Sequence, residues 1–395
     1  MAGTIQSLIL TPLAAVNTPF PRRNRPYRSI STLIRSCKPS DEIHGSDLAN
    51  GLNWTKPLIN FTSNNFLPLA LTSGVAFGLA NPTLGCLADK YHLSKFSTFG
   101  IFVVSGLTLR SDAIGAAAKA WHVGLFGLCS ILLFTPYFSR LILLIPLQPQ
   151  EFVTGLAIFT CMPTTLSSGV ALTQLAGGNT AIALAMTVVS NMLGILIIPF
   201  SISIFIADGV GVHVPTTELL RSLLLTLLLP LILGKVLRES FRGLANYVDH
   251  NRKLFSKISA VFLSLVPWMQ VSRSRSLLLM VKPAAFVVAI GMGTLLHLVL
   301  LAFNTLAIRS LSAVSGGDKS IFSEKENAIA TLLVASQKTL PVMVAVVEQL
   351  GGAFGESGLL VLPCVAARLI QIILDSFLVN FWLRRDLSSN TAKVA

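Results

Sequence analysis

Charged residues are scarce in this sequence: Asp, Glu, Lys and Arg make up 12% of the 395 residues, whereas hydrophobic residues make up 53%. Ordinary soluble domains carry about twice this share of charge. A soluble fold could not bury so many long apolar runs, so a soluble enzyme or binding domain is excluded. The composition predicts a chain that crosses a membrane many times.

Patterns of metal-binding and disulfide-forming residues are also missing. The six histidines form no metallopeptidase motif, and paired acids, a Ser/Lys pair or a His-rich set at one membrane depth are lacking. The cysteines have no paired spacing and predict small apolar fillers; they are Cys37, Cys86, Cys129, Cys161 and Cys364. We therefore predict that the protein is not an enzyme and holds no metal cofactor.

Acidic residues are absent from the first 40 positions, and Asp41 is the first of them. The same stretch contains nine Ser or Thr residues and six basic residues: Arg22, Arg23, Arg25, Arg28, Arg35 and Lys38. A basic, hydroxyl-rich and acid-poor start is typical of an organelle transit peptide, and the abundance of Ser, Thr and Pro favours the plastid over the mitochondrion. We assign residues 1–45 to a plastid transit peptide and disordered N-terminus, and 384–395 to a disordered C-terminal tail.

The apolar runs after Phe66 predict an all-α membrane protein of about ten transmembrane helices, because an apolar helix of roughly 20 residues spans the hydrocarbon core. Alternating strand patterns, which a barrel requires, are missing. The expected spans are 64–82, 96–110, 119–145, 151–176 (interrupted), 179–206, 217–239, 255–271, 283–311, 326–350 (interrupted) and 356–383. In the first span, the spacing of Gly74 and Gly78 predicts close helix packing.

The two halves of the chain, 64–206 and 217–383, echo each other. Thr165-Leu166 precedes the run 174–178 (QLAGG), and Thr339-Leu340 precedes 349–352 (QLGG). Five helices in each half place the repeats in opposite orientations, which is a pattern of secondary transporters. Chance matches between apolar segments remain the alternative.

The basic residues gather in loops that a ten-helix topology places on one side. The densest cluster is Lys235, Arg238, Arg242, Arg252, Lys253 and Lys257. The positive-inside rule explains this bias without nucleic-acid binding, although the net charge is +13. It predicts that both mature termini lie on that side, which is the stroma if the plastid assignment holds.

The fourth and ninth helices are both interrupted near their centres, at 161–169 around Pro163 and at 335–341 around Pro341. Proline removes a backbone donor, and an opened helix persists in a membrane only inside protein or beside a wet cavity. The free helix ends can then bind ions or anionic ligands. The predicted ion- or substrate-binding residues at the breaks are Thr165, Ser167, Ser168, Ser336, Gln337, Lys338 and Thr339.

Lys338 carries a charge near the centre of an apolar span, which costs at least about 2.5–3.5 kcal/mol on insertion scales. We interpret it as a fixed cation in the binding cavity; a lysine extending to the membrane surface is the alternative. Asp375, which shares a face of the tenth helix with Arg368, is a candidate partner. Predicted interfacial residues are Arg140, His297 and Glu348.

The fifth helix adds Thr187 and Asn191, which share one face at i, i+4. Their hydroxyl and amide oxygens suit a hard cation such as Na⁺. Ordinary packing of small polar residues between helices is the alternative interpretation.

From about Phe66 to Arg385, the chain resembles the bile acid:sodium symporter family, and in particular a plastid branch from plants. The most specific segment runs from Cys161-Met162-Pro163 to Gly177-Gly178-Asn179, and it is similar to the branch of the vertebrate sodium/bile acid cotransporter seven. The resemblance implies a ten-helix inverted repeat in which discontinuous helices 4 and 9 cross. It also implies two bound Na⁺ ions and an organic anion moved by alternating access.

Several positions depart from the family pattern. Ser168 and Thr187 are retained, but Gly169 and Ala183 replace an asparagine and a serine; helix 9 has Leu333 in place of an acidic sodium ligand and Lys338 in place of an asparagine. One added positive charge at about 4 Å opposes a bound cation by about 4 kcal/mol at an effective dielectric near 20. The departures argue against ordinary Na⁺ binding in at least one site.

The sequence as a whole predicts a secondary transporter of a small organic anion in the plastid envelope. Its expected partners are that anion and membrane lipid, with no nucleic acid. Sodium coupling and sodium-independent transport both remain open, and a non-transporting regulator of ion homeostasis is a further alternative.

Overall fold

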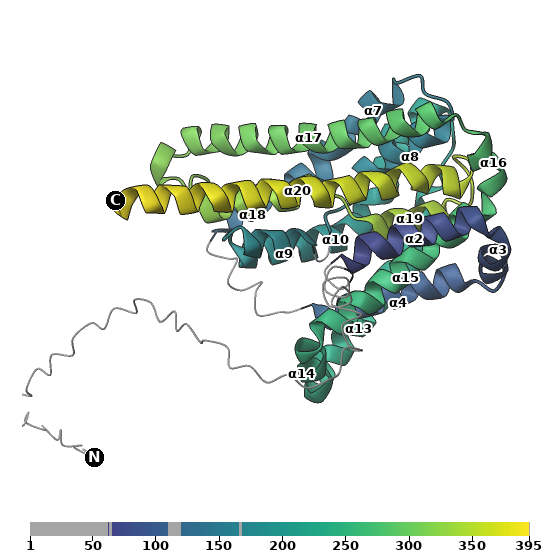
Figure 1. The fold of residues 1–395 in the computed structure, drawn as a ribbon, viewed down its shortest axis with the longest axis horizontal. Helices are drawn as coiled ribbons and strands as arrows, with labels where there is room; N and C mark the ends of the chain where they lie inside the picture. The colour runs from purple at the N-terminus through teal and green to yellow at the C-terminus, as the bar shows by residue number, and fades with distance from the viewer. Residues whose placement is uncertain (1–61, 63–64, 110–119, 166–167, 395) are drawn as a thin grey trace, which may run out of the picture. The chain divides into compact units, whose positions relative to one another are not determined.

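The computed structural model describes residues 62, 65–109, 120–165 and 168–394, and every regular element in these ranges is helical (Figure 1). The first half comprises α2 (Phe66–Ala80), α3 (Pro82–Lys90), α4 (Leu93–Thr108), α6 (Trp121–Cys129), η2 (Ser130–Phe134), η3 (Thr135–Tyr137), α7 (Phe138–Leu143), α8 (Gln150–Thr160), α9 (Ser168–Leu175), α10 (Thr180–Ile202), η4 (Ser203–Ala207) and α11 (Asp208–Val210). The second half comprises α12 (Thr216–Leu223), η5 (Leu224–Leu228), α13 (Leu229–Ser240), α14 (Arg242–His250), α15 (Arg252–Arg273), α16 (Arg275–Met280), α17 (Pro283–Val314), η6 (Gly317–Lys319), α18 (Lys325–Ser336), α19 (Leu340–Gln349) and α20 (Ser357–Val394). The prediction of an all-α protein is confirmed.

Among the described residues, seven helical stretches are long and apolar enough to cross a membrane. They are Trp121–Leu143, Thr180–Val210, Thr216–Ser240, Arg252–Arg273, Pro283–Val314, Lys325–Gln349 and Ser357–Arg385. The pair α2 and α3, bent by 102°, brings the number to eight if it forms one span. These stretches confirm a multi-pass membrane protein.

The two remaining predicted spans are shorter or interrupted. The range 96–110 corresponds to α4, which has 16 residues, and 151–176 is divided between α8 and α9. The transit segment 1–45 lies outside the described residues. At the other end, α20 runs on to Val394, through most of the range 384–395 that the sequence assigns to a disordered tail.

Four helices pack in pairs through glycine, which allows backbones to approach closely. In the first pair, α2 packs on α15, and Gly74 and Gly78 face the carbonyl oxygens of Ser264 and Trp268. In the second pair, α4 packs on α13. The close packing predicted from the Gly74–Gly78 spacing is thus present.

A second group of helices surrounds the interrupted segments. Here α8 packs on α20, α10 on α18, and α17 contacts both α18 and α20. The stretch Lys325–Gln349 is the most enclosed candidate span, with 89% of its most apolar window buried. The broken helix therefore lies in the protein interior, where side chains can satisfy its opened backbone.

Candidate functional site

The two interruptions lie against each other. The chain leaves the helix after Thr160 and again after Ser336. The amide of Thr339 then donates to the carbonyl oxygen of Pro163 (2.9 Å), and the Thr164 hydroxyl donates to the carbonyl oxygen of Val334 (2.5 Å). Each break therefore satisfies backbone groups that the other exposes.

Proline explains why the helices stop here. Pro163 and Pro341 have no backbone N–H, so neither can continue the hydrogen-bond ladder of the helix before it. Pro341 instead occupies the first turn of α19, where a missing donor costs little. Gly194 of α10 faces the Pro163 ring, and an added Cβ there would lie 3.1 Å from it. Helix α10 thus packs closely on the first break.

Lys338 is completely buried beside this junction. Its Nζ donates to the carbonyl oxygens of Ile131 (3.2 Å) and Met162 (2.9 Å) and to the hydroxyl oxygen of Thr135 (2.5 Å). A buried ammonium needs such oxygens because it loses its hydration shell. The alternative of a lysine extending to the membrane surface is therefore wrong. These three partners do not include Asp375, the partner considered from the sequence.

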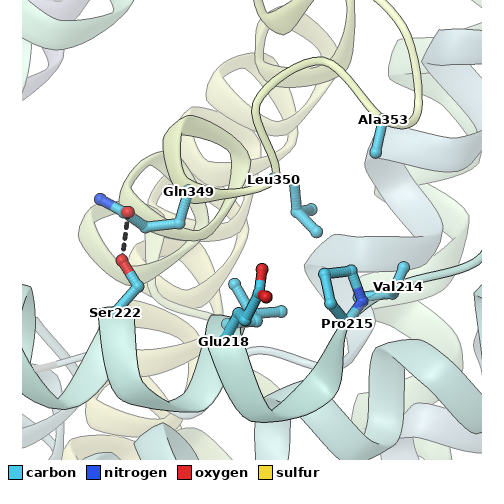
Figure 2. Close-up of a pocket in the computed structure, with 8 residues that line it drawn as sticks. Val214, Pro215, Glu218, Ser222, Gln349, Leu350 and Ala353 are labelled. Carbon is cyan, nitrogen blue, oxygen red and sulfur yellow. Dashed lines mark hydrogen bonds between the residues drawn. The ribbon is translucent and has the colours of Figure 1, made fainter.

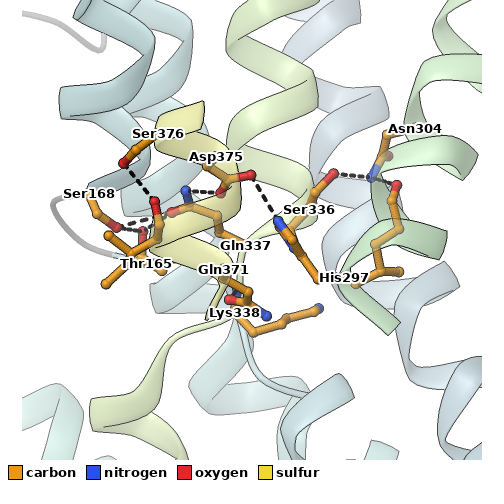
Figure 3. A network of polar contacts seen from close by, with 12 residues as sticks. Thr165, Ser168, His297, Asn304, Ser336, Gln337, Lys338, Gln371, Asp375 and Ser376 are labelled. Carbon is orange, nitrogen blue, oxygen red and sulfur yellow. Dashed lines mark hydrogen bonds and ion pairs between the residues drawn. The ribbon is translucent and has the colours of Figure 1, made fainter. Parts of the chain in front are cut away.

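Gln337 links the two breaks through its side chain (Figure 3). Its Oε1 accepts from Thr165 Oγ1 (2.9 Å) and Ser168 Oγ (3.0 Å), while its Nε2 donates to Asp375 Oδ2 (2.6 Å). Three predicted site residues thus meet in one cluster. Ser167 lies outside the described residues.

Asp375 pairs with His297 instead of Lys338. The two side chains are fully buried, and His297 Nε2 lies 2.8 Å from Asp375 Oδ1. The other ring nitrogen, Nδ1, lies 3.2 Å from the carbonyl oxygen of Ser336. The prediction of an interfacial His297 is therefore wrong, because α18 and α20 enclose this face of α17.

The polar network extends beyond the predicted residues. Asn304 donates to Ser336 Oγ (3.1 Å) and accepts from Ser130 Oγ (2.6 Å). On the other side, Arg368 donates to Ser168 Oγ and Gln371, and Gln371 Oε1 accepts from the Lys338 amide (3.3 Å). Sequence reasoning missed Ser130, Thr135, Asn304 and Gln371 as parts of the site. The seven-residue spacing of His297 and Asn304 within an apolar helix could have indicated two of the network's positions.

Thr187 and Asn191 behave differently from each other. The Thr187 hydroxyl donates to the Ala183 carbonyl within its own helix (2.8 Å). The Asn191 amide donates to the Thr164 carbonyl oxygen in the first break (2.9 Å) as well as to Thr187 O (2.8 Å). Asn191 therefore contacts the broken segment, whereas the Thr187 hydroxyl bonds only within its own helix in the contacts described here.

Comparisons with known proteins agree with this architecture. The SBF-like CPA transporter family matches residues 64–384, which include both halves and both breaks. The chain belongs to this family.

Individual relatives show which branch of the family the chain resembles. The probable sodium/metabolite cotransporter BASS4, chloroplastic, of Arabidopsis thaliana is 63% identical over 395 aligned residues, with 92% of this chain and 90% of that protein covered. Its namesake from Oryza sativa subsp. indica is 62% identical over 336 residues, covering 85% and 79%. Sodium/bile acid cotransporter 7 of Xenopus tropicalis is 24% identical over 313 residues, covering 77% and 88%. The predicted resemblance to the plant plastid branch is confirmed.

The structure shows the surroundings of Leu333, one of the positions that depart from the family pattern. Leu333 stands where the resemblance implies an acidic sodium ligand, and its fully buried side chain belongs to an apolar cluster with Leu172, Ile329 and Val379. In the described part of the chain, no three His, Cys, Asp or Glu side chains gather at one point that could hold a metal ion. The Leu333 side chain therefore offers no oxygen ligand to a cation.

This SBF-like protein also has a small pocket away from the breaks (Figure 2). The pocket, of about 250 Å³, lies between α12 and the segment that follows α19. The Ser222 hydroxyl donates across its edge to Gln349 Oε1, and Glu218 faces the pocket. The hydrogen bond ties α12 to the end of the second broken helix.

Proposed function

We propose that this protein is a secondary transporter that carries a small organic anion across the plastid envelope by alternating access. Membership in a transporter family and the chloroplast assignment in the names of its plant relatives support the proposal. The acid-poor, hydroxyl-rich segment 1–40 supports the same compartment. The stromal placement of both mature termini follows from the positive-inside bias and is part of this proposal.

The architecture we propose is a ten-helix inverted repeat in which the broken helices cross. The helix pairing is consistent with it, because α2 packs on α15 just as α13 packs on α4. In an inverted repeat α2 corresponds to α13, and α4 corresponds to α15. The contact between α2 and α15 therefore corresponds to the contact between α13 and α4. The hydrogen bond between Thr339 and Pro163 supports a crossing at the centre. The wider set of ion- or substrate-binding residues predicted at the breaks and on α10 belongs to the same proposal.

The observation that carries the mechanism is the environment of Lys338. Two carbonyl oxygens and one hydroxyl oxygen surround its ammonium group. Such oxygens are also the ligands that a hard monovalent cation would use. In the sequence, Lys338 could either replace a coupling cation or bind the charge of the substrate. Because the ammonium group is fully buried and already has three oxygen partners, we favour the first role.

Arg368 and Asp375 add a second cation and a carboxylate to the same interior. The three residues Lys338, Arg368 and Asp375 together have a formal charge of +1. A positive interior favours an anionic substrate over a cationic one. We therefore propose transport of an organic anion that does not require an inward sodium gradient.

The test is uptake of a panel of small carboxylates and sulfonates by proteoliposomes. We expect saturable uptake of at least one anion at the same rate with and without an imposed Na⁺ gradient. The variant Lys338→Ala should lose most of this uptake, whereas Lys282→Ala, at an exposed position before α17, should retain it.

Two results would change the proposal. If uptake by the wild type requires a Na⁺ gradient, the sodium-coupled mechanism implied by the names of the relatives is supported instead. A protein that is folded but carries none of the anions would favour a non-transporting regulator of ion homeostasis.

A further inference from the structure

A second pocket, of about 580 Å³, lies where α17 and α20 approach their C-terminal ends and α18 begins. Figure 1 shows these three helices side by side toward the end marked C. The lining residues come from all three helices: Thr305, Ile308, Arg309, Lys325, Ala328, Ile329, Leu332, Trp382 and Arg385. The proposed transport mechanism does not use this pocket.

The direction of the helices separates its charged residues from its apolar ones. Helices α17 and α20 run toward this end, so Arg309 lies beyond Thr305 and Arg385 lies beyond Trp382. Lys325 is the first residue of α18, which runs the other way. Leu332 follows seven residues later, about 10 Å deeper along the helix. The three cations therefore share the mouth of the pocket, with apolar side chains below them.

The charged residues that line the mouth are all basic. Arg309, Lys325 and Arg385 are all exposed, and the described lining residues include no Asp or Glu. Glu324 and Glu326 flank Lys325 in sequence, and the Glu324 carboxylate accepts a hydrogen bond from Asn327 Nδ2 (2.7 Å). Positive charge at the mouth suits a ligand with a negatively charged group.

The lower part of the pocket suits a hydrocarbon chain. Ile329 belongs to a buried cluster that includes Val379, and Trp382 packs against that cluster. Helix α17 forms one wall, and only 28% of its most apolar window is buried within the protein. That wall is therefore part of a largely lipid-facing helix. A free phosphate could use the mouth but would leave the apolar part of the pocket without a partner.

From this geometry we infer that the pocket binds a membrane phospholipid with an anionic headgroup. The phosphate lies among Arg309, Lys325 and Arg385, and one acyl chain follows the apolar residues between α17 and α18. Trp382 lies at the level where its ring can contact both regions, as tryptophans do at membrane interfaces.

Native mass spectrometry of the full chain tests the assignment. The protein is incubated with phosphatidylglycerol or with phosphatidylcholine of the same acyl composition, and the retained lipid is counted. We expect the wild type to retain phosphatidylglycerol in preference to phosphatidylcholine. The variant Arg309→Gln/Lys325→Gln/Arg385→Gln should bind phosphatidylglycerol more weakly, on the order of fivefold for each cation removed.

Three controls separate the pocket from general charge and from folding. The variant Lys90→Gln/Arg242→Gln/Lys253→Gln removes the same charge at exposed positions outside the pocket and should retain the lipid. The variant Arg309→Lys/Arg385→Lys keeps the charge and should also retain it. Glycerol phosphate, which has the anionic group without acyl chains, should not displace the lipid.

The inference is overturned by any of three results. The first is equal retention of phosphatidylglycerol by the wild type and the triple Gln variant. The second is equal retention of the two lipids by the wild type, and the third is displacement by glycerol phosphate. If the triple variant fails to fold, Arg385→Gln alone provides the comparison. Retention of phosphatidylglycerol by this variant at the wild-type level also overturns the inference.

Discussion

At the scale of single residues, the protein buries a lysine side chain in its interior and supplies oxygen atoms for the lysine nitrogen. Lys338 is among the largest fully buried side chains, and its ammonium group contacts η2, η3 and the first break. Removing an ammonium from water is costly unless hydrogen bonds replace its hydration. Met162 follows the end of α8, and its carbonyl oxygen provides one of these bonds.

Removing the Lys338 side chain is expected to make the melting temperature of the protein depend on Na⁺. In Lys338→Ala the three oxygens lose the lysine nitrogen as a donor, while the Ile131 carbonyl keeps the bond from the Thr135 hydroxyl (2.6 Å). Each group left unsatisfied costs about 1–3 kcal/mol of unfolding free energy. Na⁺ can then enter the space and bind the same oxygens, so it should raise the melting temperature of the variant.

Thermal unfolding in detergent, with NaCl compared against choline chloride, measures this effect. The wild type and the control Lys282→Ala should show no difference between the two salts. A Lys338→Ala variant whose melting temperature is the same in both would mean that the oxygens around Nζ do not form a cation site.

At the scale of elements, glycine determines how closely the helices pack. A Cβ at Gly234 of α13 would overlap the Val103 carbonyl oxygen of α4, and one at Gly106 would overlap the Leu231 carbonyl oxygen. The two helices thus present glycine to each other's backbones. In contrast, a Cβ at Gly124 of α6 would meet no atom within 4 Å.

Alanine substitution should therefore have opposite effects at two helical glycines. Gly234→Ala forces α13 away from α4, and overpacking of this kind typically costs about 1–3 kcal/mol. Gly124→Ala has open space and should stabilise by up to about 1 kcal/mol, because alanine has the higher helix propensity. Melting temperatures of the two variants in the same detergent give the comparison, and equal destabilisation would contradict the close approach of α4 and α13.

At the scale of the whole molecule, we expect the proposed alternating access to separate α12 from the end of α19 or to slide one past the other. The Ser222–Gln349 hydrogen bond joins them at the edge of the smaller pocket. A covalent link at this position should hold the molecule in the arrangement described here.

We expect that the double variant Ser222→Cys/Gln349→Cys, joined by a short bifunctional thiol reagent, loses anion uptake in proteoliposomes. Each single cysteine variant, treated in the same way, should retain uptake and thereby controls for reaction at Cys86, which is exposed. A cross-linked protein that transports at the uncrosslinked rate would show that these two elements do not move relative to each other.

The sequence by itself determined the class of protein, the positions of its apolar helices and the two breaks, because these depend on local composition. Long apolar runs require lipid or a large interior, and proline ends a helix wherever it falls. The sequence also identified Lys338 as the residue whose charge needs an explanation.

Only the tertiary structure decided which groups satisfy that charge. Ile131, Met162 and Lys338 are far apart along the chain, and two of the three oxygens belong to backbone carbonyls, which residue type does not reveal. The pairing of Asp375 with His297 likewise depends on how α17 and α20 face each other. Side-chain partners across helices follow from packing, and packing is a property of the whole fold that local patterns do not encode.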